Sequence, residues 1–156
     1  MNTEVAPLYY EDVTVGAKAV TPSRTVTETD IMLWVGISGD YDLIYVDEEF
    51  AKTTQMGGRI APGALTVALA QGLFARTWNL GGSGIGMLGW EGVKFRGYVK
   101  PGDTVTGELE VTDKRDSSSV PNAGIITFKI TLRNQKGDVI LIMDKWIELI
   151  IHRPKA

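Results

Sequence analysis

The hydrophobic positions of the chain follow a helical spacing in its first half and a strand spacing in its second half. A β-branched run over residues 19–27 predicts a first strand. The apolar positions of residues 31–37 predict a helix, which Thr29 or Asp30 caps and Gly39 ends. Helices followed by strands, rather than alternating with them, indicate the α+β class.

The most apolar helix is predicted from Pro62 to Leu80. Its hydrophobic residues fall on nearly every helical face, with almost no charge before Arg76, which predicts that the helix is buried all round. Pro62 suits the first helical turn, and residues 79–82, Asn-Leu-Gly-Gly, end the helix. A sheet wrapped around this helix would bury it.

Strand patterns fill most of the remaining chain. Residues 139–151 are apolar on both faces, so we expect this last strand to be central in the sheet or packed in an interface. Other strands are expected over residues 91–99, 104–112 and 126–132. The pattern therefore predicts one α+β domain over residues 1–156, with a curved antiparallel sheet of about five strands around the long helix.

Composition narrows the functional classes. The 156 residues are 44% hydrophobic and 22% charged, which is ordinary for a globular domain. The net charge of −3 argues against a nucleic-acid-binding protein. Cysteine is absent and His152 is the only histidine, so we expect no catalytic triad, no metal site and no cofactor.

Targeting and membrane segments are not expected either. Residues 1–4 have no basic start and lead into no apolar core segment, which argues against a signal peptide. No apolar run approaches the roughly 20 residues that a membrane-spanning helix needs. We therefore expect a soluble, cytoplasmic protein that binds neither membrane nor nucleic acid.

Residues 84–89, Gly-Ile-Gly-Met-Leu-Gly, match the dinucleotide-binding pattern G-x-G-x-x-G. That motif requires a preceding strand and a following helix, whereas this segment follows a helix and leads into the strand pattern of residues 90–95. We interpret it as the glycine-rich start of a strand with close backbone packing.

The most distinctive chemistry lies in residues 38–51. Asp40 follows the expected end of a helix and precedes aromatic and apolar residues; by itself, such an aspartate is commonly a turn residue. A second block, residues 57–63, ends in Pro62-Gly63 at the start of the apolar helix. The two blocks are expected to place one carboxylate, Asp40, near the amino end of this helix.

Together with residues 100–103, Lys-Pro-Gly-Asp, these blocks resemble the MaoC-like dehydratases, the (R)-specific enoyl-CoA hydratase group of the hot-dog fold. The resemblance runs from Tyr10 to the end of the last strand. The family's first block usually has the form Gly-Asp-x-Asn-Pro-x-His-x-Asp. This chain keeps Gly39, Asp40 and Asp47, and it has Asp42 for Asn, Leu43 for Pro, Tyr45 for His, and Pro62-Gly63 where the second block often ends His-Gly.

The resemblance implies roles for three residues. In the family, Asp and His hold one water and add it reversibly to a 2-enoyl thioester, while a helix-opening glycine N–H polarises the thioester carbonyl. Carried over, Asp40 is the acid/base and the Gly63 N–H is the oxyanion donor. Tyr45 can orient a water, but an ordinary pKa of about 10 makes it a poor base; its alternative is a core or pocket-wall aromatic. Asp42 adds a second carboxylate near the site, which would raise the pKa of Asp40 if both were buried.

Four further residues are candidates for substrate binding. Gln71, inside the apolar helix, either reaches the acyl pocket or makes a packing hydrogen bond. Lys94 and Arg96 lie on one strand face, and Arg59 lies in the Gly-Gly-Arg block. These cations would meet CoA phosphates or an acidic carrier protein, or they belong to ordinary solvated surfaces.

The leading hypothesis is reversible hydration and dehydration of a 2-enoyl/3-hydroxyacyl thioester, carried by CoA or acyl carrier protein. Its first rival is a non-catalytic hot-dog subunit that binds acyl thioesters. A thioesterase ranks third, because such hot-dog enzymes often use a carboxylate on the central helix and the helix from Pro62 to Leu80 has none. The resemblance also implies a homodimer whose sheets join edge to edge, with the acyl groove at the interface.

Overall fold

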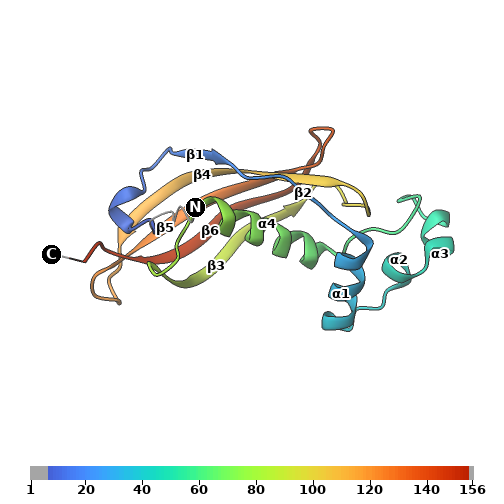
Figure 1. Cartoon of the computed structure of the whole chain (residues 1–156), viewed down its shortest axis with the longest axis horizontal. Coiled ribbons are helices and arrows are strands. Elements are labelled where there is room, and N and C mark those ends of the chain that lie inside the picture. The colour runs from blue at the N-terminus through green and yellow to red at the C-terminus, as the bar shows by residue number, and fades with distance from the viewer. Residues whose placement is uncertain (1–6, 155–156) are drawn as a thin grey trace, which may run out of the picture.

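The computed structural model describes residues 7–154 of the chain. Figure 1 shows a curved sheet that arches around a long helix, with shorter helices beyond one end of the sheet. The elements in chain order are η1 (Tyr10–Asp12), β1 (Lys18–Val20), β2 (Arg24–Thr25), α1 (Glu28–Ser38), α2 (Leu43–Val46), α3 (Glu48–Thr53), α4 (Gly63–Thr77), β3 (Gly84–Phe95), β4 (Thr104–Asp116), β5 (Ala123–Arg133) and β6 (Val139–Ile151).

All strand pairs are antiparallel, and the order in the sheet is β1-β4-β5-β6-β3, with β2 also paired to β4. This confirms the predicted α+β class and the sheet around a long helix. β6 lies between β5 and β3, which confirms its expected central position and explains why it is apolar on both faces. β3 is an edge strand.

The core lies between α4 and the inner face of the sheet. Alternate residues of β5, among them Phe128, point inward and are fully buried. Phe74 of α4 contacts the rings of Phe128 and Trp146 at centroid distances of 4.9 and 5.6 Å. These large aromatic side chains anchor the helix to the middle of the sheet, since each buries a large apolar area.

Helix α4 is shorter and less enclosed than its pattern predicts. It begins at Gly63, ends at Thr77, and leaves one face exposed, with Ala64, Gln71 and Ala75 at the surface. The prediction of burial all round was wrong because alanine and glycine count as apolar in the pattern whether or not anything covers them. One sheet encloses one side of the helix, and the small residues line the other.

The first strand and the cap of the first helix also differ from expectation. The run 19–27 is divided around Pro22 into β1 and β2, because proline has no N–H to give to the β4 ladder. Thr27, not Thr29 or Asp30, caps α1: its Oγ accepts the Asp30 N–H at 3.2 Å, and the Asp30 carboxylate accepts the Thr27 N–H at 2.8 Å. Asp30 is the second half of a capping box.

Two predicted strands have different bounds. β3 begins at Gly84 and ends at Phe95, so the glycine-rich residues 84–89 belong to the strand itself, in agreement with the interpretation against dinucleotide binding. Its pairing with β6 shifts register between Gly84 and Gly86 and between Met87 and Gly89. Such irregularities bend a strand, and glycine tolerates them. β4 continues past the predicted end to Asp116.

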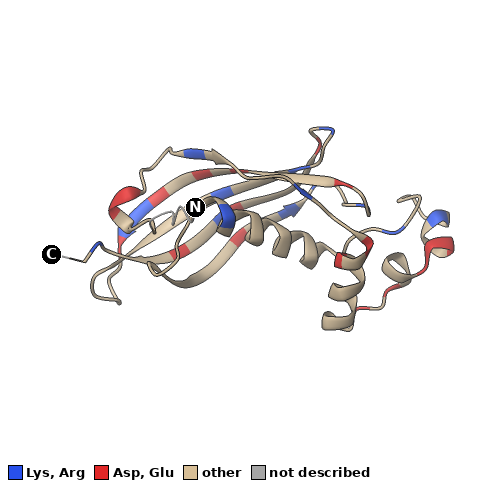
Figure 2. Cartoon of the chain, in the orientation of Figure 1, with Lys and Arg blue, Asp and Glu red and all other residues tan. Residues whose placement is uncertain are grey.

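The helices α1, α2 and α3 form a lobe beyond the sheet, next to the amino end of α4 (Figure 1). Figure 2 shows that acidic residues gather on this lobe, whereas both charge signs occur along the sheet. The Arg59 side chain, which follows the lobe, pairs with Glu28 of α1 and with Glu48 of α3, the latter at 3.3 Å. This cation therefore links the first and last helices of the lobe.

Candidate active site

Gly63 is the first residue of α4, directly after the N-cap Pro62. The first N–H groups of a helix have no carbonyl partner within it, and they lie at the positive end of the helix dipole. A Cβ on Gly63 would lie 3.1 Å from the Phe95 ring of β3. Glycine therefore lets the Phe95 ring pack closely against the amino end of α4.

An apolar groove of about 490 Å³ starts at Gly63. The exposed face of α4 forms one wall, and the inner side of the edge strand β3 forms the other. Trp34 of α1, Trp90 and Phe95 of β3, and Gln71 of α4 line it. Gln71 is exposed rather than inside a buried helix, so its amide is available at the far end of this groove. An apolar groove with few polar groups is the usual form of a site for a small organic ligand.

Asp40 lies just past the end of α1 and is exposed. Gly39 takes the left-handed conformation, φ 73°, that ends the helix, and the Asp40 N–H donates to Ser38 Oγ at 3.2 Å. Asp42 is also exposed and caps α2, since its carboxylate accepts the Ile44 N–H at 3.2 Å. The premise of two buried, interacting carboxylates is therefore wrong, because the α1–α2 loop lies at the surface.

Tyr45 is half-buried and packs against the hydrophobic core. Burial raises the pKa of its hydroxyl, and the negative charges of Asp40 and Asp42 raise it further. These electrostatic contributions show that the three side chains share one region at the junction of α1 and α2. A raised pKa keeps Tyr45 neutral at neutral pH, so its hydroxyl serves as a hydrogen-bond donor and not as a base.

The chain is similar in sequence to known proteins of one enzyme family. The family model described as MaoC like domain matches residues 12–130. The (R)-specific enoyl-CoA hydratase of Rhodospirillum rubrum is 33% identical over 123 residues, which cover 79% of each protein. The chain belongs to the MaoC-like dehydratase family.

Solved structures agree on the fold. The MaoC-like dehydratase of Rhodospirillum rubrum superposes with a TM-score of 0.80 at 26% identity, over 95% of this chain and 99% of that one. A conserved hypothetical protein of Mycobacterium tuberculosis with a double hotdog fold gives a TM-score of 0.85 at 19% identity, over 96% of this chain and 46% of that one. The hot-dog fold is thereby confirmed, and at family level this MaoC-like chain is a hydratase or dehydratase.

Two of the three cations expected to bind substrate in this MaoC-like chain, Lys94 and Arg59, are paired with carboxylates of the protein. Lys94 Nζ pairs with Asp144 on the neighbouring strand β6 at 2.5 Å, and Arg59 joins the helices of the lobe. Arg96 is exposed and lines a separate hollow of about 550 Å³ together with Lys100. Gln71 and Gly63 therefore share the apolar groove, whereas Asp40, Tyr45 and these three cations do not line it.

The single histidine lies away from this site. His152 follows β6, whose end lies on the side of the sheet opposite to the lobe (Figure 1). Its Nδ1 is 2.6 Å from Glu11, and its ring lies 4.6 Å from the Tyr10 ring. The Arg153 backbone N–H and the His152 side chain lower the pKa of Glu11 to about 2. His152 thus joins η1 to the end of the sheet and does not replace the family histidine within this protomer.

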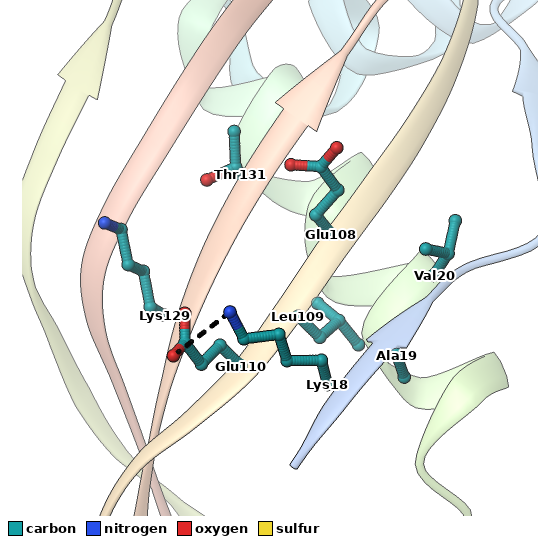
Figure 3. A pocket seen from close by; sticks show the side chains of 8 residues that line it. All are labelled: Lys18, Ala19, Val20, Glu108, Leu109, Glu110, Lys129 and Thr131. Carbon is teal, nitrogen blue, oxygen red and sulfur yellow. Dashed lines mark ion pairs between the residues drawn. The ribbon is translucent and has the colours of Figure 1, made fainter. Parts of the chain in front are cut away.

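A second hollow, of about 480 Å³, lies on the outer face of the sheet, where β1 meets β4 and β5 (Figure 3). Lys18 and Glu110 form an ion pair at 3.6 Å across it. Its side chains carry charges of both signs, and none of the residues singled out from the sequence lies there. We assign it no part in the MaoC-like chemistry.

Sequence reasoning missed the aromatic walls of the groove. Trp34 comes from α1, and Trp90 and Phe95 come from β3. These two elements are distant in sequence and meet at the groove only in the folded chain. A usable signal was the surplus of large apolar residues on β3, a strand with few buried positions.

Within residues 7–154, no cluster of three or more acidic or histidine side chains could hold a metal ion. In that same range no helix is long and apolar enough to cross a membrane.

Proposed function

We propose that this protein catalyses the reversible hydration of 2-enoyl thioesters to 3-hydroxyacyl thioesters, with acyl-CoA as the substrate class. Asp40 is the acid/base, the Tyr45 hydroxyl orients the water, and the Gly63 N–H polarises the thioester carbonyl. Family membership supports the reaction class, and the roles of these residues are our assignment.

The observation that carries the proposal is the apolar groove that begins at the amino end of α4. A thioester whose carbonyl oxygen accepts the Gly63 N–H would lay its acyl chain between α4 and β3, along the groove of about 490 Å³. As water adds to the double bond, negative charge develops on that oxygen. A backbone N–H at a helix start stabilises such charge without having to reorganise.

The water chemistry needs one base and one orienting group. Asp40 accepts a proton from water while the water oxygen bonds to the β-carbon, and the proton is then delivered to the α-carbon, so that H and OH are added in total. The Tyr45 hydroxyl, which is neutral at neutral pH and whose pKa is raised further by burial, donates a hydrogen bond to the water oxygen. It fills the family's histidine position without supplying a second base.

We also propose a homodimer formed through β3. This edge strand exposes large apolar side chains on an unpaired ladder, which is unusual for a free edge. The exposed residues are Ile85, Met87, Leu88, Trp90 and Phe95. Pairing of two β3 strands would cover these residues and the groove beside them, and so exclude water from the acyl chain.

The carrier is proposed to be CoA, bound by cations at the surface. Arg96 and Lys100 line one hollow and suit phosphate groups, because a guanidinium binds phosphate through two parallel hydrogen bonds. Lys94 and Arg59 would contribute only if a phosphate displaced the carboxylates that they bind. Asp42 would affect the substrate only electrostatically, because its carboxylate adds a negative charge near Asp40.

The test is hydration of 2-enoyl-CoAs of several chain lengths, followed by the loss of enoyl absorbance. We expect Asp40→Asn to lower the rate by about 10²–10⁴, the usual contribution of a general acid/base. Asp42→Asn is the matched control, because asparagine caps a helix as well as aspartate does, and it should retain most activity. Equal, negligible rates for wild type and Asp40→Asn on every substrate would refute the enzyme assignment.

A second candidate function is a non-catalytic subunit that binds acyl thioesters. The observation that favours it is Tyr45 at the family's histidine position, with a pKa raised by burial and by two carboxylates. On this reading the groove and the Gly63 N–H bind the thioester, and no group completes the proton transfer. Such a subunit would bind acyl-CoA without turnover.

A further inference from the structure

A second cavity, of about 350 Å³, lies farther along α4 than the acyl groove. The second half of α4, the chain that follows it and the inner face of β6 enclose this cavity. Gln71 lines both the cavity and the groove. Because an α-helix rises about 1.5 Å per residue, Gln71 lies about 12 Å along α4 from the Gly63 N–H. The cavity is therefore at the end of the groove that is distant from the thioester.

The cavity contains a buried carboxyl group, Glu148 of β6. Its side chain points to the inner face of the sheet, opposite Ile126 of β5, and only 7% of its surface is exposed. The Trp146 indole N–H donates to Glu148 Oε1 at 2.6 Å. Within residues 7–154, Oε2 accepts no hydrogen bond and no cation pairs with the carboxyl group. Burial raises the pKa of Glu148, which favours its neutral form.

Trp78, at the carboxyl end of α4, lines the cavity and carries a second buried polar atom, its indole nitrogen. Its side chain is 9% exposed and packs on Phe128 with centroids 5.4 Å apart. Its Nε1–H is buried and has no acceptor among the described residues. Buried donors are nearly always paired in proteins, so an unpaired one beside a cavity indicates that a bound group supplies the acceptor.

We propose that this cavity recognises a hydroxyl group on the distal part of the acyl chain. The hydroxyl oxygen accepts the Trp78 Nε1–H, and the Glu148 carboxyl group makes the second hydrogen bond. A hydroxyl both donates and accepts, so it can pair with either oxygen of a neutral carboxyl group. The proposal rests on the proposed function, which places the thioester at Gly63 and the acyl chain along α4.

The surroundings favour a neutral polar group over a carboxylate. No lysine or arginine lines the cavity within the described part of the chain, and a buried carboxylate next to Glu148 would lack a cation to offset its loss of hydration. A plain alkyl end would leave the Trp78 N–H and Glu148 Oε2 without partners. A site with buried polar groups rejects a ligand that cannot pair with them.

The experiment compares three CoA substrates of equal chain length: 2-octenoyl-CoA, 8-hydroxy-2-octenoyl-CoA and the analogue with a carboxylate at the distal end. We expect kcat/KM to be about tenfold higher for the hydroxylated substrate than for the other two, the effect of about one or two hydrogen bonds. Trp78→Phe keeps the ring and removes the N–H, so it should abolish the preference, bringing the ratio of the kcat/KM values of the hydroxylated and plain substrates to about one. Glu148→Met should also reduce it.

Trp90→Phe is the matched control, because Trp90 also contacts Trp146, at 5.6 Å, but lines the groove and not the distal cavity. It should affect the hydroxylated and plain substrates alike. Thermal unfolding of each variant verifies that it is folded. Equal kcat/KM values for the two substrates, a preference for the carboxylate, or a preference that survives Trp78→Phe would overturn the proposal while hydration itself stands.

Calorimetry with octanoyl-CoA and 8-hydroxyoctanoyl-CoA measures the binding affinity of the distal site for a hydroxyl group without requiring turnover. If no enoyl-CoA is hydrated, the proposed function fails, but tighter binding of the hydroxylated thioester, lost in Trp78→Phe, would still support the distal site. Equal affinities would mean that the cavity holds only water, and the proposal would be wrong.

Discussion

The two carboxylates that matter most to this protein, Asp40 and Glu148, have opposite surroundings. Asp40 is exposed on the loop after α1, held by a hydrogen bond from its own backbone to Ser38. Glu148 is buried in the sheet against Trp146, with no cation beside it in the described structure. The first is exposed to water, whereas burial favours the neutral form of the second.

This difference separates the two ends of the proposed acyl site. A group that moves protons must exchange them with water and substrate, so an accessible aspartate fits the reacting end once a ligand and a second protomer exclude solvent. A group that recognises a fixed polar atom gains from burial, because a missing hydrogen bond is costly there. The comparison predicts that changes near Asp40 alter the rate and that changes at Glu148 alter selectivity and stability.

After Asp40 itself, the largest effect is expected at Tyr45, beside it. If its hydroxyl orients the water, Tyr45→Phe and Tyr45→His should each lower the hydration rate by about 10², within the usual range for such groups. Phenylalanine removes only the hydroxyl, and histidine restores the family's residue without the reach of tyrosine. Steady-state assays with one short enoyl-CoA measure both variants.

The opposite result would also be informative. An inactive wild type that gains turnover through Tyr45→His would mean that this chain is the acyl-binding subunit and that a missing base is its only defect. In that case Asp40 would already be placed for catalysis, and the contrast with Glu148 would describe a ligand site alone.

The sequence predicted the outline of the fold because the outline depends on periodicity. The alternating pattern of β5 and the two-sided apolar pattern of β6 correctly indicated an inner face and a central strand. The hydrophobic pattern gave a wrong prediction where small apolar residues are not covered by another element. Ala64 and Ala75 count as apolar, yet they lie on the open face of α4, and nothing in their spacing tells which face a sheet will cover.

The candidate site could be predicted only in part, for a related reason. The block around Asp40 and the glycine that opens α4 are local in sequence, so they can be recognised there. The distal cavity joins Trp78 to Glu148 through the pairing of distant strands, and no local pattern contains both. One clue was present: Glu148 is an acidic residue within the apolar run 146–151 of an expected central strand.

A change at the edge strand tests whether the reacting end needs a second protomer. We expect Leu88→Lys, on β3, to weaken a β3-paired dimer by about 10²-fold, because symmetry would bring two like charges together in an apolar contact. Leu88 is 54% exposed in the single chain, so the change should hardly affect folding. Analytical ultracentrifugation measures the dimer, and the hydration assay at the same concentrations measures the rate.

Val20→Lys is the control for this variant. Val20 is 69% exposed on β1, the strand at the other edge of the sheet, and lysine there should leave assembly unchanged. A monomeric wild type with full activity would contradict the dimer and the enclosure of the groove by it. If Leu88→Lys abolished the dimer but kept full activity, the catalytic groups of one protomer, including Asp40, would be sufficient for hydration.

The smallest effect is expected on the free energy of unfolding when Glu148 is changed. The pH dependence of that free energy tests most directly the contrast between the buried Glu148 and the exposed Asp40. The pKa of Glu148 is raised in the folded protein, whereas in the unfolded chain it is about 4.3. Below that pH the group is protonated in both states and its contribution to stability is fully present. As the pH rises, the unfolded chain releases the proton first, so wild type loses stability until the pH passes the folded pKa.

Glu148→Gln keeps an oxygen that can accept the Trp146 N–H and cannot ionise. Its unfolding free energy, relative to wild type, should therefore rise with pH from about 4 and level off above the folded pKa, by about 1.4 kcal/mol for each unit of upward shift. Urea unfolding at a series of pH values measures this difference. Glu110→Gln, on the outer face of the same sheet, controls for the removal of one negative charge. A Glu148→Gln difference that is constant from pH 4 to 8 would show that the buried carboxyl group is as ready to ionise as an exposed one, and the contrast with Asp40 would be lost.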